Sequence, residues 1–258
     1  MGIRNLVDDI NPWFIKKLNS HLMSGAAISP PIGHFRPSMF SMCKDIDDMC
    51  LREMLYNYLG KVTEATFDIA SIRRMIAGTA HHQMWEQVFR DAGIIVHPGC
   101  LMRIKGDDVY AFDKDKNLFV RVRQDKGANY PNIHGTCDFQ IAEDEKSELE
   151  LIEWKSGNYK GIKFGHIMQW QLYSIMLDIN NGWIVIENRD NAEPKPFKVK
   201  RDNKLVRVLF DRMRLIEEYS AKKKVFSQDN RCLSKEWTPK DCAQYNLCFS
   251  DNGDIPWT

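Results

Sequence analysis

The chain has 258 residues, of which 43% are hydrophobic and 28% are charged, and this composition is typical of a folded globular protein rather than a disordered one. A chain of this length can bury a full core without disulfides, and it suits one elaborated domain or two small ones. It contains neither a run of 18 apolar residues nor an apolar leader, so the sequence predicts an intracellular protein without a membrane span.

The N-terminal third is predicted to be helical. A short first helix is followed by a loop rich in Gly, Pro and Ser, so we expect residues 1–37 to form an N-terminal helix and loop, and residues 38–258 to form the main domain. Apolar residues at helical spacing predict two further helices, Ser38–Leu59 and Asp68–Ala92, and each is followed by a glycine typical of a helix end.

After Gly93 the pattern changes to β-strands. Four short strand-like runs, separated by turn residues, come before residue 125. The later predicted elements are, in chain order, strands over Ile133–Ala142 and Leu149–Lys155, a helix over Lys163–Asn180, a strand over Trp183–Glu187 and a helix over Lys204–Lys223. This order predicts an α/β fold with a mixed central β-sheet flanked by helices, a helical N-terminal part and a cysteine-bearing C-terminal part.

Charge is segregated along the chain although the net charge is only +1. Residues 195–224 contain eleven Lys and Arg against four acids, while residues 143–153 contain six acids and one lysine. This pattern suits a protein with a polyanion-binding surface and a metal-binding locus, and it equally suits two solvated faces.

The chemically most informative residues are Asp138, Glu153 and Lys155. Side chains alternate along a strand, so Glu153 and Lys155 point to one face and Trp154 to the other. Antiparallel pairing with the strand of Asp138 would bring the two carboxylates together beside an ammonium group. Paired carboxylates suit Mg²⁺ or Mn²⁺, which can activate a water and polarise a phosphoryl group. The alternative is a surface hairpin with an ordinary Glu–Lys pair.

Four short motifs extend this constellation. They are Gly78–His82 on the second helix, Gly135–Asp138, Glu153–Lys155 and Gln169–Tyr173 on the following helix. In this order they resemble the PD-(D/E)XK nuclease superfamily, specifically its RecB-type exonuclease branch, which includes CRISPR-associated adaptation nucleases and phage recombination exonucleases. The resemblance covers residues 38–250, and it implies a restriction-endonuclease-like core.

The resemblance implies a divalent metal site. Its ligands would be the side chains of His82, Asp138 and Glu153 together with the backbone carbonyl of Trp154. His81 is the rival of His82, and a structural role is the alternative for either histidine. Related nucleases often carry a further acidic residue on the strand before the Gly135–Asp138 motif, and no glutamate occurs between residues 86 and 143 here, which argues against a second acid-bound metal.

The resemblance also implies roles for residues around the metal. Lys155 would be the catalytic lysine, and Gln169 and Tyr173 would steady that lysine and the DNA backbone. Trp154, Trp170 and Tyr173 could stack on single-stranded bases or pack in the core, and for Trp154, which faces away from Lys155, core packing is the preferred interpretation.

The chain has seven cysteines, an odd number, and disulfides are not expected in a reducing compartment. Cys100 and Cys137 lie in strand-like segments and are interpreted as packing residues. The other five cysteines lie near the two ends of the sequence, where a metal or a cluster could join them.

Some members of the RecB-type branch hold a [4Fe–4S] cluster, and the resemblance implies one here. Cys50 matches the first ligand, and Cys242 and Cys248 match the last two. A proline stands at position 239, where the remaining ligand is expected, so Cys232 is the candidate through a longer loop. Cys43, one heptad before Cys50, is the substitute. Zinc at four thiolates and unconnected cysteines remain the alternatives.

The function implied by the resemblance is metal-dependent DNA exonuclease activity on DNA ends or single strands, in recombination, repair or phage DNA processing. DNA would be the main partner, with recombination or repair proteins as further candidates, in the cytoplasm of a bacterial cell or a phage-infected host. A structure-specific endonuclease on the same fold and a nuclease-like DNA-binding accessory subunit are the alternatives.

Overall fold

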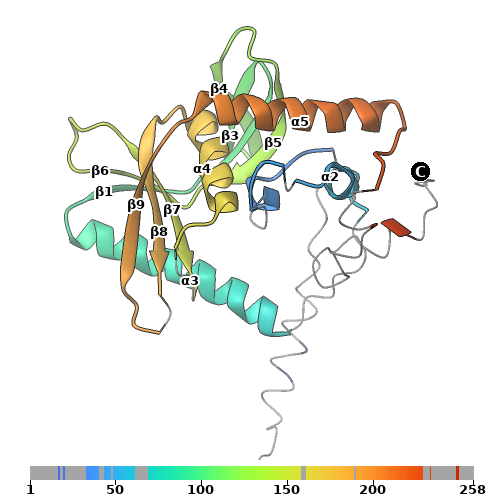
Figure 1. Ribbon diagram of the computed structural model, residues 1–258. Coiled ribbons are helices and arrows are strands. Elements are labelled where there is room, and N and C mark those ends of the chain that lie inside the picture. The colour runs from blue at the N-terminus through green and yellow to red at the C-terminus, as the bar shows by residue number, and fades with distance from the viewer. Residues whose placement is uncertain are drawn as a thin grey trace, which may run out of the picture.

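The computed structural model shows the arrangement of the chain in Figure 1. It describes residues 17, 20, 33–40, 44–47, 49–61, 69–157, 161–188, 190–228, 233, 248 and 249. Its helices are η2 (Pro37–Phe40, a 3₁₀-helix), α2 (Leu51–Tyr58), α3 (Ile69–Asp91), α4 (Phe164–Leu177) and α5 (Asn203–Ala221). Its strands are β1 (Ile95–Pro98), β2 (Leu101–Gly106), β3 (Asp108–Asp113), β4 (Leu118–Gln124), β5 (Tyr130–Thr136), β6 (Phe139–Ala142), β7 (Glu150–Ser156), β8 (Asn181–Glu187) and β9 (Pro194–Lys200).

A five-stranded mixed sheet lies at the centre, in the order β1-β6-β7-β8-β9. Only β7 and β8 pair in parallel, because α4 connects them as a crossover helix, and their neighbours pair antiparallel. Figure 1 shows α3 on one face of this sheet and α4 on the other. Trp154 on β7 packs toward α3, whereas Leu151 accepts a hydrogen bond from Trp170 of α4. The expected mixed sheet flanked by helices is therefore confirmed.

A second, four-stranded antiparallel sheet has the order β4-β3-β2-β5. Residues 33–36 run beside its edge strand β5, because the Phe35 amide donates to the Asn132 carbonyl and the His134 amide donates to the Phe35 carbonyl. The Phe35 side chain is fully buried in the core on one side of this added segment.

The single strand expected over 133–142 is wrong. The chain leaves β5 at Thr136 and enters β6, in the other sheet, at Phe139. Asp138 therefore lies in a two-residue link between the sheets rather than inside a strand. Its backbone carbonyl accepts a hydrogen bond from the Gly99 amide, which stabilises the chain where it changes sheets.

The continuous helix expected over 38–59 is also wrong. After η2, residues 44–47 form bends and a turn, and α2 begins only at Leu51. Cys50 has an extended backbone (φ −78°, ψ 106°) and caps α2, since its Sγ accepts a hydrogen bond from the Glu53 amide at 3.4 Å. The cluster of aspartates after residue 44 favours turns and caps over a helix interior. Cys50 therefore lies at the start of α2 and not within a helix, and Cys43 lies outside the described residues.

The helices and strands from α3 onward otherwise follow their predictions closely, with one addition. The helix expected within residues 1–37 lies almost entirely outside the described residues. Strand β9 was not expected, and it pairs antiparallel with β8 at the edge of the central sheet, where its prolines are tolerated. None of the described helices has both the length and the apolar character that crossing a bilayer requires.

Candidate active site

Asp138 and Glu153 meet where the β5–β6 link passes β7. Phe139 pairs with Ile152, so the next position outward places Asp138 beside Glu153. Oδ2 of Asp138 accepts a hydrogen bond of 2.7 Å from the backbone amide of Trp154. The change of sheets therefore fixes one carboxylate against the strand that carries the other.

Glu153 is a buried acid, with a side chain only 1% exposed. Lys155, two residues further along β7 and on the same face as expected, contacts Oε1 of Glu153 through its ammonium group. Oε2 is buried and has no hydrogen-bond partner among the described residues. A buried carboxylate oxygen without a partner is costly, so this position favours a bound cation.

The electrostatics of the carboxylate pair point the same way. Burial, and then repulsion from Asp138, raise the pKa of Glu153 to about 7, although Lys155 opposes the shift. Burial also raises the pKa of Asp138, against the favourable effects of Lys155 and of the Trp154 amide. Both shifts show that the site disfavours two negative charges in the absence of an added cation.

The structure places the two neighbouring histidines of α3 differently. Nδ1 of His82 lies 3.5 Å from Oδ1 of Asp138. Burial lowers the pKa of His82, while Glu153 and a hydrogen bond with the Trp154 backbone favour the charged form. A neutral imidazole beside a carboxylate is the form that binds a metal. His82 thus lies beside Asp138 and the Trp154 backbone, and the charge of Glu153 acts on it.

His81 instead faces Glu187, at the end of β8. Its Nε2 lies 2.5 Å from Oε2 of Glu187, and the same oxygen accepts hydrogen bonds from the indoles of Trp85 at 2.9 Å and Trp154 at 2.8 Å. Burial opposes the charge on Glu187, but these hydrogen bonds hold its pKa below the ordinary value. Trp154 is a core residue of this aromatic cluster, as its preferred interpretation predicted.

Gln169 and Tyr173 lie on the face of α4 that borders the carboxylates, and both are buried. Burial and then Glu153 raise the pKa of Tyr173 well above its ordinary value, while a hydrogen bond with Gln169 opposes this. Gly135 is required for the close approach of Tyr173, since a Cβ at Gly135 would lie 2.8 Å from its Cε1. Gly78 has no such role, because a Cβ there meets nothing within 4 Å.

His166 is a site residue that the sequence analysis missed. It is buried in the first turn of α4, where its Nδ1 accepts a hydrogen bond from the Lys163 amide at 3.3 Å. Burial, followed by the charges of Lys155 and Lys163, lowers the pKa of His166 to about 4. The signal that could have identified it is its position one turn before Gln169 on the same helix.

The described part of the chain contains no preformed metal cage. Within the described ranges, no group of three or more His, Cys, Asp and Glu side chains is arranged to hold a metal ion as it stands. The partnerless oxygen of Glu153 and the raised pKa values of both carboxylates nevertheless fit a divalent cation, because oxygen ligands suit Mg²⁺ and Mn²⁺.

The described cysteines separate into two groups. Cys137 is buried and Cys100 is partly buried, and burial raises the pKa of both thiols, so they are packing residues as interpreted. Cys50 and Cys248 are both buried. Arg52, on the first turn of α2, donates to the backbone carbonyl of Cys248 at 3.4 Å, so the segments that carry these two thiols lie side by side. Cys43, Cys232 and Cys242 lie outside the described residues.

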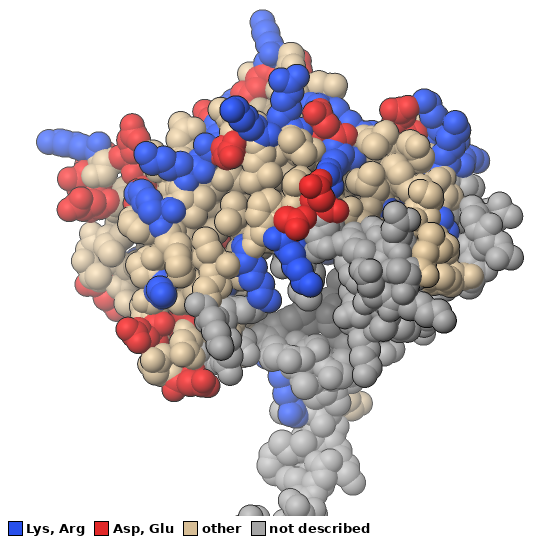
Figure 2. All heavy atoms as spheres, in the orientation of Figure 1, with Lys and Arg blue, Asp and Glu red and all other residues tan. Residues whose placement is uncertain are grey.

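The basic segment 195–224 covers β9 and α5. Five of its eleven cations form ion pairs with acids: Lys198, Arg201, Arg212, Arg214 and Lys222. On the face seen in Figure 2, blue Lys and Arg side chains alternate with red acidic ones and do not merge into one patch. This face is closer to a solvated surface than to a dedicated polyanion site.

Neither protein-family models nor curated proteins match this sequence. Among solved structures, that of SSO0001 is similar with a TM-score of 0.47 and 17% identity, over 80% of this chain and 87% of that one. The alkaline exonuclease LHK-Exo from Laribacter hongkongensis is similar with a TM-score of 0.44 and 14% identity, over 79% of this chain and 97% of that one. Its complex with dAMP gives 0.43 and 14%, over 81% and 97%. These are similarities of fold.

Proposed function

We propose that this protein is a metal-dependent DNA exonuclease of the RecB type. The observation that carries the proposal is the buried pair of Asp138 and Glu153 on adjacent segments of the central sheet, with Lys155 beside it and one carboxylate oxygen left without a partner. Metal-dependent phosphodiester hydrolysis uses such a concentration of negative charge, because it recruits a divalent cation to the scissile phosphate.

The residues that would hold Mg²⁺ or Mn²⁺ are His82, Asp138 and Glu153, together with the backbone carbonyl of Trp154. When bound, the ion would polarise the phosphoryl oxygen and lower the pKa of a water. The chain itself contributes orientation. The Trp154 amide fixes one oxygen of Asp138, and Glu153 presents the oxygen that has no partner among the described residues.

Lys155 is proposed to stabilise the negative charge that develops on the phosphate in the transition state. Its side chain is 23% exposed, so it reaches from the buried carboxylate to solvent. Gln169 and Tyr173 are proposed to position this lysine and the DNA backbone. Their burial and their hydrogen bond hold them rigidly on α4 beside the carboxylate pair.

We further propose a [4Fe–4S] cluster held by Cys50, Cys232, Cys242 and Cys248. The support from the described residues is that Cys50 and Cys248 are both buried and that Arg52 joins their segments. Such a cluster would tie the two end segments that carry these cysteines together. A cytoplasmic role in recombination, repair or phage DNA processing, with DNA as partner, completes the proposal.

The test is a cleavage assay on end-labelled linear and on circular single-stranded DNA, with Mg²⁺ or Mn²⁺ and with Asp138→Asn as matched control. Loss of nucleotides from ends only, absent in the control, is the expected result. Cutting of circles would indicate an endonuclease instead. Binding without any cleavage by the parent protein would indicate an accessory subunit and would overturn the enzymatic assignment.

A further inference from the structure

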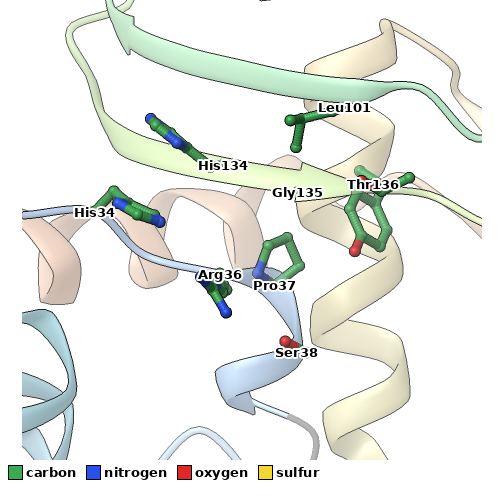
Figure 3. A pocket seen from close by; sticks show the side chains of 9 residues that line it. His34, Arg36, Pro37, Ser38, Leu101, His134, Gly135 and Thr136 are labelled. Carbon is green, nitrogen blue, oxygen red and sulfur yellow. The ribbon is translucent and has the colours of Figure 1, made fainter. Parts of the chain in front are cut away.

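A cleft lies next to the carboxylate pair, between residues 34–38 and strands β2 and β5. It has a volume of about 440 Å³, and Figure 3 shows His34, Arg36 and Ser38 on one side and His134 and Thr136 on the other. No Asp or Glu is among the described residues that line it. Gly135 and Tyr173 also line the cleft. Besides burial, the charges of Glu153 and Asp138 raise the pKa of Tyr173, so the cleft lies beside the candidate active site.

The positive character of the cleft comes from three parts of the fold: residues 34–36, strand β2 and strand β5. His34 and His134 stack with ring centroids 4.1 Å apart. Burial, followed by repulsion from His34, Arg103, Arg36 and Lys105, lowers the pKa of His134 to about 4. These positive groups repel one another, and no acid among the described lining residues offsets the repulsion. A bound anion would therefore stabilise the cleft.

The tautomer of His134 also prepares it for an anion. Nδ2 of Asn132 donates to the Gly33 carbonyl, so Oδ1 of Asn132 faces Nε2 of His134 at 3.1 Å. In the neutral imidazole Nε2 therefore carries the proton, and Nδ1 is the position that protonates when an anion binds.

The cleft continues into a row of side chains across the second sheet. Arg121 pairs with Tyr110, Tyr110 with Arg103, and Arg103 with His134, and directly paired residues share a face. Arg103 lies 5.7 Å from the Tyr110 ring, and its buried Nε has no partner among the described residues. Arg121, at the outer end, is paired with Asp108.

This face of the sheet is concave. Strands β4 and β5 are separated by two others, which corresponds to about 14 Å in a flat sheet. The rings of Phe119 on β4 and His134 on β5 are nevertheless only 5.7 Å apart, so the sheet curls around these side chains. Alternating cations and aromatic rings in a concave surface are what a single nucleic-acid strand requires.

We propose that the cleft binds phosphate groups of a single nucleic-acid strand through Arg36, His34 and His134, and that the Arg103–Tyr110 row extends this track across the second sheet. The proposal rests on the proposed nuclease function, because it supplies the path by which a strand reaches Asp138 and Glu153. The phosphates could be internal or terminal, and the two share the same chemistry.

The test measures binding of a fluorescent oligothymidylate to the full chain in EDTA, by anisotropy over a range of salt concentrations. Each lost phosphate contact lowers the slope of log affinity against log salt by about 0.7 for a single strand. We expect Arg36→Gln to weaken binding several-fold and to lower the slope by about this amount, and Arg103→Gln to act in the same direction. Arg90→Gln, which removes an exposed cation from α3, should leave both at parent values.

Unchanged slopes in both Arg36→Gln and Arg103→Gln, with melting temperatures at the parent value, would overturn the proposal. An effect retained on circular oligonucleotides identifies internal phosphates, and one confined to 5′-phosphorylated linear strands identifies a terminal phosphate. Binding in EDTA needs no cleavage, so the two proposals fail separately. If the parent protein cleaves DNA but the cleft variants bind with an unchanged salt slope, only the proposed phosphate binding in the cleft is refuted. If the variants lower the salt slope but the parent protein never cleaves DNA, only the nuclease assignment is refuted.

Discussion

Lys155 contacts only one of the two carboxylate oxygens of Glu153, although the two residues share a face of β7. The other oxygen is buried, no described residue donates to it, and Asp138 and His82 act electrostatically on the same carboxylate. An ion pair that leaves one buried carboxylate oxygen without a hydrogen bond contributes little to the stability of the fold. The arrangement is better explained as a site held ready for a divalent cation.

The first prediction concerns the two carboxylates. Asp138→Asn and Glu153→Gln keep the side-chain volume but remove a negative charge, so each should lower the rate of metal-dependent cleavage by ~100-fold or more. Melting temperatures should stay near or above the parent value, because burial already disfavours both charges. Cleavage rates and thermal unfolding curves test this, and a variant that cleaves at the parent rate would remove its residue from the metal site.

The second prediction concerns pH in the absence of metal. The pKa of Glu153 is raised from the ordinary 4.5 to about 7, so the folded protein binds more protons than the unfolded chain between these values. Stability should therefore be greatest below pH ~4.5, as far as this group contributes, and should fall as the pH rises through ~7. We expect the melting temperature in EDTA to fall by several degrees across this range.

The matched control for this pH dependence is Glu153→Gln, which cannot titrate. Its melting temperature should change less with pH than that of the parent protein. Added Mn²⁺ should remove most of the difference in the parent protein, since it stabilises the charged carboxylate. Equal pH dependence in the two proteins would mean that Glu153 has an ordinary pKa.

The third prediction separates the neighbouring histidines. His82→Ala should raise the Mn²⁺ concentration needed for half-maximal cleavage by ~10-fold or more, because a ligand is lost. His81→Ala should leave that concentration unchanged and instead lower stability by about 1 kcal/mol, through the lost hydrogen bond to Glu187. Metal titrations and unfolding curves measure the two effects, and the reverse pattern would assign the ligand to His81.

Much of this site could be predicted from the sequence because its key relations are local. Alternation along one strand placed Glu153 and Lys155 together and Trp154 on the opposite face, and the i, i+4 spacing of about one helical turn placed Gln169 beside Tyr173. The same local reasoning found most helix and strand ranges, since their apolar periodicity is regular.

What could not be predicted depends on pairing between distant segments. The change of sheets at Asp138 follows from β5 pairing with β2 and β6 pairing with β1, and neither partner is encoded near residue 138. The approach of residues 33–36 to β5 is equally nonlocal, so the cleft beside His134 had no sequence signal. The aspartates before Cys50 were a local indication of a turn, but the apolar periodicity of residues 38–59 favoured a continuous helix in the prediction.

The fourth prediction contrasts two motif glycines that the sequence analysis treated alike. Gly135→Ala should destabilise the protein by about 1–3 kcal/mol, because the new methyl group would lie 2.8 Å from both the Tyr173 ring and the Pro37 ring. Gly78→Ala lies inside α3 with open space around it, so it should stabilise by up to about 1 kcal/mol. Thermal unfolding of both variants checks this, and a stable Gly135→Ala protein would show that Tyr173 can move away.

The fifth prediction concerns the cysteines and is tested by absorbance and iron content of protein purified without oxygen. The parent should be brown. Cys242→Ser and Cys248→Ser should lose colour and iron, and Cys137→Ser should keep both despite a cost of about 1–3 kcal/mol for its buried hydroxyl. If Cys232→Ser keeps its iron and Cys43→Ser loses it, the fourth ligand is Cys43 and not Cys232. A parent protein with neither iron nor zinc would exclude a cluster.

Cys50→Ser is the most discriminating of these variants. Cys50 caps α2 by accepting a hydrogen bond from the Glu53 amide, and serine is a better cap than cysteine at this position. The substitution should therefore leave α2 intact or strengthen it. If Cys50→Ser nevertheless loses iron and melts at a lower temperature than the parent, the lost stability comes from the cluster and not from the helix. If it keeps its iron, Cys50 serves only as the cap of α2, and the first ligand must be sought elsewhere in the chain.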